Sequence, residues 1–198
     1  MNHFNNSLFL LLNAQAQPNA LLLLVGKFFA TYVTLLIPIS LLAGWLWGTE
    51  RSRKLMLEAT ASGLLGLLMA QIIGLVYFHP RPFALGLGHL LIPHAANASF
   101  PSDHLTLFWA VSFSFLVHPQ TRRLGVALAL LGLPVAWARI FVGVHFPLDM
   151  VGAAAVSVVS AWLAFRGAGL YLVPFYSLAI TLHRKLFSPL IKRGWVGK

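Results

Sequence analysis

A histidine and an aspartate stand four positions apart in the segment 143–149, as His145 and Asp149. Pro147 lies between them and suits the first turn of a helix, which brings the carboxylate within reach of the ring. A carboxylate bonded to one ring nitrogen fixes the tautomer and leaves the other nitrogen as a base or nucleophile. We therefore predict that Asp149 orients His145 as a base or a nucleophile. The alternative is an interfacial histidine beside an aspartate that only caps the helix.

A second polar segment, Pro101 to His104, stands before another apolar run. It has the character of a helix start, where free backbone N–H groups and the helix dipole favour an anion. Ser102 could add its hydroxyl to the same anion, and His104 could protonate a leaving oxygen. Taken alone, the segment fits an ordinary helix cap followed by a solvated histidine better than it fits an anion site.

Two arginines, Arg81 and Arg139, accompany these segments. A guanidinium binds two phosphate oxygens at once, so both are predicted phosphate ligands. Each could instead be an arginine that extends to the membrane surface. Charged groups at the ends of membrane spans are costly unless they are hydrated or paired. Their concentration in three short polar segments, 79–82, 101–104 and 139–149, therefore predicts one polar site that binds a phosphate group.

The elements that must position this site are membrane helices. The chain has 198 residues, of which 59% are hydrophobic and 9% charged, whereas soluble domains carry about 25% charged residues. Apolar runs near the bilayer-spanning length of about 20 residues recur. We predict an all-α, polytopic transmembrane bundle forming a single domain over residues 1–198. The five expected spans are approximately Ala20–Trp47, Leu55–Phe78, His104–Val117, Leu124–Val142 and Pro147–Phe165.

Two further apolar segments are short. Gly167–Leu182 contains a proline and fits either a sixth span or a helix lying at the membrane surface. Leu8–Asn13 is similar to a signal peptide but has no basic residue before it, so we expect an interfacial helix there. Small residues recur every fourth position at Ser62, Gly66, Ala70 and Gly74, which predicts close helix packing along one stripe.

The net charge of +10 comes from basic clusters between apolar runs, which indicates membrane orientation and not nucleic-acid binding. With five spans, most basic residues fall on one face, which is then cytoplasmic. They are Arg51, Arg53, Lys54, Arg122, Arg123, Arg166, Arg184, Lys185, Lys192, Arg193 and Lys198. The three polar segments fall on the opposite face. This arrangement predicts a site open to the periplasm or the cell exterior.

The polar segments resemble the three-part signature of the type 2 phosphatidic acid phosphatase superfamily. Within it, Phe100–His104 and Gly143–Asp149 are similar to the bacitracin-resistance type of undecaprenyl-diphosphate phosphatase. The resemblance implies that His145 forms a phosphohistidine, that Asp149 orients it and that His104 is the general acid. It also implies three phosphate ligands, which are Arg81, Ser102 and Arg139.

The sequence departs from the family pattern at two positions. Gly74 stands where the first motif usually has a lysine, and Ala138 where the third usually has a serine. Asp103 stands where the wider superfamily often has glycine, and this residue is typical of the diphosphatases; we include it at the phosphate site without a defined role. Lys27, seven residues into the first span, could supply the missing charge. Its alternative role is contact with lipid headgroups.

The expected activity is hydrolysis of undecaprenyl diphosphate to undecaprenyl phosphate and phosphate. This reaction would recycle the lipid carrier of cell-wall synthesis at the outer face of a bacterial inner membrane. We expect no cofactor and no metal, and partners limited to the polyprenyl diphosphate and membrane lipids. A phosphatase or phosphotransferase for glycerophospholipid or lipid A phosphates is the nearer alternative. A small transporter is the more distant one, disfavoured because the polar groups cluster at span ends and not at the midplane.

Overall fold

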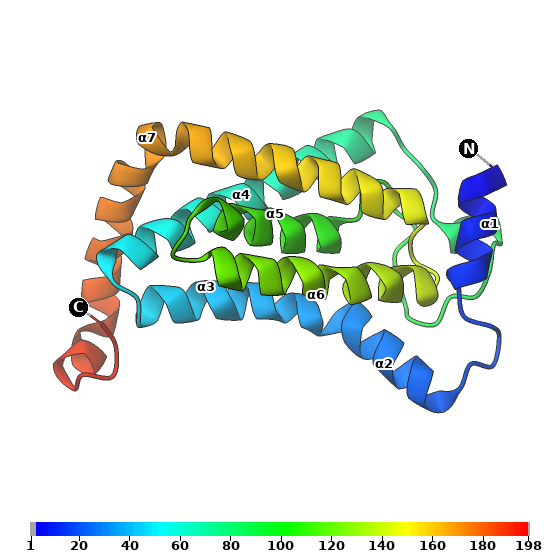
Figure 1. Cartoon of the computed structure of the whole chain (residues 1–198), viewed down its shortest axis with the longest axis horizontal. Helices are drawn as coiled ribbons and strands as arrows, with labels where there is room; N and C mark the ends of the chain where they lie inside the picture. The colour runs from blue at the N-terminus through cyan, green and yellow to red at the C-terminus, as the bar shows by residue number, and fades with distance from the viewer. Residues whose placement is uncertain (1–2, 198) are drawn as a thin grey trace.

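The computed structural model describes residues 3–197, and this part of the chain is helical with connecting loops. Figure 1 shows helices packed side by side along one long axis, with α1 standing across one end. The predicted all-α bundle is confirmed. The elements in chain order are α1 (His3–Leu12), α2 (Ala20–Thr31), η1 (Val33–Leu35), α3 (Leu36–Leu46), α4 (Glu50–Val76), η2 (Pro82–Leu85), α5 (Asp103–Val117), α6 (Arg122–Phe141) and α7 (Pro147–Lys192).

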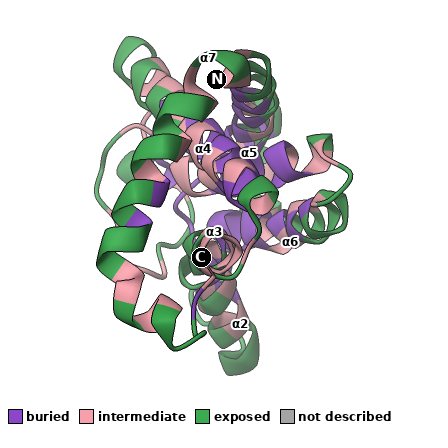
Figure 2. Cartoon of the chain, turned by 90° about the vertical axis from the view of Figure 1, so that its left-hand side faces the viewer, coloured by how far each residue is buried: buried purple, intermediate pink, exposed green. Residues whose placement is uncertain are grey.

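Four helical stretches of the described chain are long and apolar enough to cross a membrane, namely Ala20–Leu46, α4, α6 and α7. Their outward faces carry exposed apolar side chains such as Leu64, Leu130 and Val151, and Figure 2 shows this exposed surface surrounding a buried interior. Lipid is the solvent that such a surface requires. The chain is therefore a multi-pass membrane protein.

Helix α5 is the centre of the bundle. Its 15 residues span about 22 Å, less than the ~30 Å of a hydrocarbon core. It packs against α4, α6 and α7, and most of its side chains, including Leu105, Phe108 and Val111, are buried. Because protein surrounds α5, the non-helical backbone at its ends is shielded from lipid and the short length is tolerated.

The first predicted span is two helices joined by a 3₁₀ turn. Pro38 lies in the first turns of α3; it has no N–H for the carbonyl of Thr34, and its ring would clash with that carbonyl. The regular helix therefore breaks at Val33–Leu35. The outer bounds, Ala20 and Leu46, agree with the prediction to within one residue.

Helix α4 begins five residues before the predicted Leu55. The side chain of Thr49 accepts a hydrogen bond from the backbone N–H of Ser52, which caps the helix at this earlier point. The first basic cluster, expected in a loop, therefore lies in the first turns of α4. It remains at the same end of the bundle as the start of α6, opposite the predicted site.

The last helix does not end with the predicted span near Phe165, because α7 continues to Lys192. Figure 1 shows α7 bending sharply and then running across the end of the bundle away from α1. Gly167 and Gly169 precede Pro174 in this region, and such residues are the usual causes of a helix kink. The second half of α7 thus agrees with the surface-helix alternative and not with a sixth span.

The far half of α7 and the end of the chain are attached to the start of α4 through Arg53. This arginine is buried, its Nη2 lies 3.3 Å from the Nε2 of His183 in α7, and it donates hydrogen bonds to the carbonyls of Trp45 and Gly197. Arg53 was predicted only as an orientation charge. Lys198, another of those predicted charges, lies outside the described residues.

Helix α1 joins the elements that meet at the opposite end. Asn5 accepts a hydrogen bond from the N–H of Leu148 in the first turn of α7. Asn13 donates to the carbonyl of Phe141, the last residue of α6, and accepts from the N–H of His89. The helix predicted to be interfacial therefore lies across the end of α6, the start of α7 and the long 77–102 loop, and is hydrogen-bonded to all three.

Candidate active site

The three polar segments converge at the end of the bundle where α1 lies. Arg81 follows α4, Ser102 precedes α5, Arg139 lies in the last turn of α6 and His145 in the 142–146 loop. All four side chains are buried. The antiparallel order of the helices places these chain positions together, as the sequence predicted.

His145 and Asp149 form the predicted pair. The Nδ1 of His145 lies 3.1 Å from the Oδ2 of Asp149, and the two side chains are 1% and 0% exposed. The same oxygen accepts hydrogen bonds from the backbone N–H of Phe146 and from the hydroxyl of Ser99. Asp149 therefore both caps α7 and holds the ring, so the two alternative roles considered for it coexist. With Nδ1 donating, Nε2 carries the lone pair.

Arg81 is fixed beside that lone pair. Its Nη1 donates to the Nε2 of His145 at 3.0 Å and to the carbonyl of Val144 at 2.9 Å. Its Nε donates to the side chain of Asn97 at 2.9 Å, and its Nη2 to the carbonyl of Ala98 at 3.1 Å. These acceptors are neutral, so the guanidinium charge remains available to an anion placed against His145.

Arg139 contributes the second buried guanidinium. Its Nη1 donates to the carbonyl of Ala30 in α2 at 3.2 Å, and its Nη2 lies 3.1 Å from the Nε2 of His94. The Nε of Arg139 is buried without a hydrogen-bond partner among the described residues. A buried, unsatisfied donor is costly. A phosphate oxygen is a suitable partner for it.

Ser102, Asp103 and His104 lie at the start of α5. Ser102 occupies the N-cap position, yet its hydroxyl does not cap the helix and is buried without a partner in the described part of the chain. It can therefore bind an added oxyanion together with the helix N-terminus. His104 is half-buried and within electrostatic range of Arg81, Arg139 and His94. Asp103 lines a separate pocket against α4.

Lys27 lies on α2 close to this region. It is half-buried and one turn before Ala30, the residue whose carbonyl bonds Arg139. Side chains on a helix lean toward its N-terminus, which in α2 is the end of the bundle that holds the site. The placement is compatible with the predicted role, and no contact to the other site residues decides it.

Three site residues were missed by sequence reasoning, namely His94, Asn97 and Ser99. Each lies in the 86–102 loop, where no periodicity or motif distinguishes it. His94 has its Nδ1 3.0 Å from the carbonyl of Ala95, which leaves its Nε2 to accept from Arg139. Their only signal was proximity in the chain to Pro101–His104.

The electrostatics of the site keep two of its histidines, His145 and His94, neutral. Burial lowers the pKa of His145 well below its usual value, and the positive charges of Arg139 and Arg81 lower it further. Burial likewise lowers the pKa of His94, against a smaller opposing effect of its bond to Ala95. Neutral imidazoles are the form in which His145 offers a lone pair and His94 accepts from Arg139.

The fold is that of a multi-pass membrane protein, and its site places two buried arginines near a histidine–aspartate pair, a set of groups suited to a phosphate. A sequence family described as the PAP2 superfamily matches residues 55–170, more than half of the chain. The chain belongs to the PAP2 superfamily, which confirms the predicted family, and it is a phosphatase.

Individual relatives extend the match over nearly the whole chain. Undecaprenyl-diphosphatase BcrC of Bacillus subtilis (strain 168) is 38% identical over 189 residues, covering 96% of each protein. Putative undecaprenyl-diphosphatase YbjG of Escherichia coli (strain K12) is 31% identical over 199 residues, covering 99% of this chain and 98% of the relative. The crystal structure of Aquifex aeolicus LpxE shares the fold, with a TM-score of 0.66 at 24% identity over 83% of this chain and 96% of that one.

Proposed function

We propose that this protein hydrolyses undecaprenyl diphosphate to undecaprenyl phosphate and inorganic phosphate through a phosphohistidine. The observation that carries the proposal is the buried His145, held by Asp149 through one nitrogen and placed against the Arg81 guanidinium through the other. Nearly full-length relatives named undecaprenyl-diphosphatases support the choice of substrate. The surface of exposed apolar side chains suits a substrate whose tail stays in the bilayer.

In the first step, the Nε2 of His145 attacks the terminal phosphorus. The bond from phosphorus to the bridging oxygen breaks, and the lipid monophosphate leaves with a proton from His104. Arg81 transfers its Nη1 hydrogen bond from His145 to a phosphate oxygen, which uncovers the lone pair. Arg139, Ser102 and the α5 N-terminus bind the remaining oxygens and stabilise the charge that develops on them.

In the second step, water attacks the phosphohistidine. His104, now deprotonated, accepts a proton from the water, and the nitrogen–phosphorus bond breaks to release inorganic phosphate. Neutral His145 and the acid form of His104 are thereby restored. We propose that no metal takes part, because the two guanidiniums supply the positive charge that such an ion would otherwise provide.

We also propose that the site faces the periplasm or cell exterior of a bacterial inner membrane, where the product would re-enter carrier recycling for cell-wall synthesis. The basic residues of the first turns of α4 and α6 lie at the opposite end of the bundle, the end that positive charge retains in the cytoplasm.

The decisive test is phosphate release by purified protein from undecaprenyl diphosphate, phosphatidylglycerophosphate and phosphatidic acid, each with and without chelator. We expect the highest kcat/KM for undecaprenyl diphosphate and no loss with chelator. A preference for either glycerophospholipid would show instead that the protein is a phosphatase for glycerophospholipid phosphates. Loss of activity with chelator that is restored by one added metal would contradict the metal-free mechanism. Absence of phosphate release from all three substrates would contradict the proposed enzymatic activity.

The nucleophile is tested by His145→Ala, which should abolish turnover and prevent formation of an acid-labile phosphoenzyme. Asp149→Asn should retain a residual rate, lower by up to about 10⁴-fold, because it misorients the ring but leaves it present. His89→Ala is the matched control, since His89 is an exposed histidine of the adjoining loop. Turnover by a folded His145→Ala protein would exclude the phosphohistidine.

A further inference from the structure

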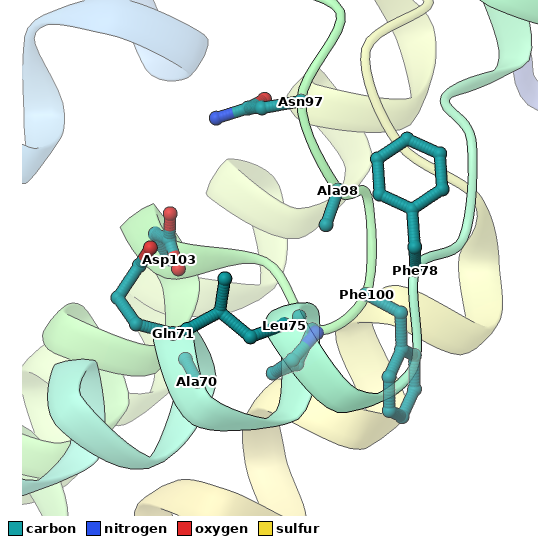
Figure 3. A pocket seen from close by; sticks show the side chains of 10 residues that line it. Ala70, Gln71, Leu75, Phe78, Asn97, Ala98, Phe100 and Asp103 are labelled. Atoms are coloured by element: carbon teal, nitrogen blue, oxygen red, sulfur yellow. The ribbon is translucent and has the colours of Figure 1, made fainter.

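A pocket beside the phosphate site lies between the second half of α4 and the segment that leads into α5. Its volume is about 240 Å³. Figure 3 shows Asp103 and Gln71 close together on one side of it and Phe78 and Phe100 on the other. The pocket thus has a small polar side and a larger apolar side. Its volume is below the ~300–1,000 Å³ of typical sites for a whole small molecule, so it suits one segment of a ligand.

Two residues join this pocket to the phosphate site. Asn97 lines the pocket, and its side-chain oxygen accepts the hydrogen bond from Arg81 Nε. Asp103 lines it also, and stands between Ser102 and His104 in the chain. A ligand whose terminal phosphate contacts Arg81 can therefore extend the apolar chain that follows its phosphates into the pocket.

The other side of the pocket reaches the lipid-facing surface. Leu75 and Phe78, at the end of α4, are 85% and 61% exposed, and both line the pocket. Ala70 and Gly74 also line the pocket, and their small side chains leave space in it. They belong to the stripe of small residues on α4 that starts at Ser62. In the first half of this stripe, Gly66 packs against Thr106 and Ser160. The stripe therefore serves helix packing at one end and leaves open space at the other.

We propose that this pocket holds the first isoprenyl segment of the substrate tail, directing the rest of the tail into the bilayer past Leu75 and Phe78. The inference rests on the proposed function. An apolar segment matches the larger wall of the pocket, and the carboxylate of Asp103 disfavours a further anionic group there. Lipid is as apolar as the pocket wall, so moving the isoprenyl segment from lipid into the pocket gains no hydrophobic free energy. The pocket therefore contributes to substrate binding through its shape.

Photo-crosslinking of the wild-type protein tests the placement directly. The probe is a three-unit isoprenyl methylene-bisphosphonate, which resists cleavage, with a diazirine on its first unit. We expect adducts at residues 70–78 and 97–103, removed by competing unlabelled diphosphate. A probe with the diazirine on its last unit should give few adducts there. Adducts of the first-unit probe elsewhere, such as the cleft between Asn13, Pro18 and Trp137, would overturn the proposal.

Filling the pocket tests its use in turnover. A Cβ at Gly74 would lie 3.2 Å from that of Ala98, whereas one at Gly169 would meet nothing within 4 Å. Gly74→Leu should lower kcat/KM for a three-unit isoprenyl diphosphate at least about tenfold, since a closed pocket excludes the tail, and leave methyl diphosphate unaffected. Gly169→Leu should change neither.

The outcomes separate the inference from the function on which it rests. Equal losses on both substrates, or no loss on either, would overturn the pocket assignment while the phosphatase stands. Absence of phosphate release from isoprenyl diphosphates by the wild-type protein would overturn the proposed function and the inference with it. If Gly74→Leu does not fold, the crosslinking of the unaltered protein decides the assignment.

Discussion

Ser99 is the residue that connects the long loop to the catalytic pair. Its hydroxyl donates to Asp149 Oδ2 and lies 3.4 Å from His145 Nδ1. A buried carboxylate that loses one of its hydrogen-bond donors is held less firmly in place. The His145 ring that Asp149 orients is then held less firmly as well. Ser99 therefore acts through Asp149 and does not reach the phosphate itself.

Replacement of this serine should separate orientation from binding. We expect Ser99→Ala to lower kcat about tenfold, the equivalent of one hydrogen bond of ~1.4 kcal/mol, with KM little changed. Steady-state kinetics on the diphosphate measure both constants. Ser40→Ala is the control, because Ser40 lies in α3 and donates to the Ile37 carbonyl of the same helix. An equal rise in KM would show that Ser99 contacts the substrate.

The protonation of His145 gives a second prediction at this scale. Burial lowers the pKa of His145, so the group should remain neutral as pH falls through ~6.5, the usual value for histidine. The acid limb of activity that belongs to it should therefore lie below this pH. Titration of the ¹⁵N-labelled imidazoles by NMR measures it, because the signal absent from His145→Ala identifies the residue. A His145 signal that titrates at pH 6.5 or above would contradict the prediction.

At the scale of elements, α2 is the one whose contribution to the site is least evident from the motifs. It packs on α6, and its Ala30 carbonyl accepts a hydrogen bond from Arg139. Gly26 permits the approach, since a Cβ there would lie 2.6 Å from the ring of Phe141. Lys27 follows directly in the chain. We propose that Lys27 lends its charge to the diphosphate.

This role predicts a loss of substrate affinity in Lys27→Met, which keeps the apolar stem and removes the charge. KM for the diphosphate should rise about five- to tenfold, as expected for one charged contact of ~1–1.4 kcal/mol, with folding intact. Lys54→Met is the matched control, because Lys54 pairs with Glu50 at the far end of the bundle. Unchanged kinetics in Lys27→Met would return this lysine to a headgroup contact.

At the scale of the whole molecule, the ends of the bundle have opposite characters. One end gathers the site and is crossed by α1; the other carries the basic first turns of α4 and α6 and is crossed by the second half of α7. Each end is fastened by polar contacts between distant segments, through Asn13 at the first and Arg53 at the second. These contacts hold the site at one end of the bundle.

The absence of cysteine from the sequence makes the orientation measurable. Gln15→Cys places one thiol in an exposed loop at the site end, and Gln120→Cys places one between α5 and α6 at the other end. The cells are treated so that the outer envelope is permeable and the inner membrane stays intact. A maleimide that cannot cross the inner membrane should then label Gln15→Cys alone. Labelling of Gln120→Cys alone would place the site in the cytoplasm.

Features that depend on neighbours in the chain could be predicted from the amino-acid sequence. Hydrophobic runs placed the spans, Pro147 placed the start of α7, and four-residue spacing paired His145 with Asp149, because helices are built from local hydrogen bonds. Local pattern did not show that the last span and the following apolar segment form one helix, α7, that bends out of the bundle. The three-dimensional packing was needed to show that Arg139 lies between Ala30 and His94, that Ser99 completes the pair, and that Gly74 borders a pocket. Such contacts join segments tens of residues apart, and packing between distant helices leaves no period in the sequence.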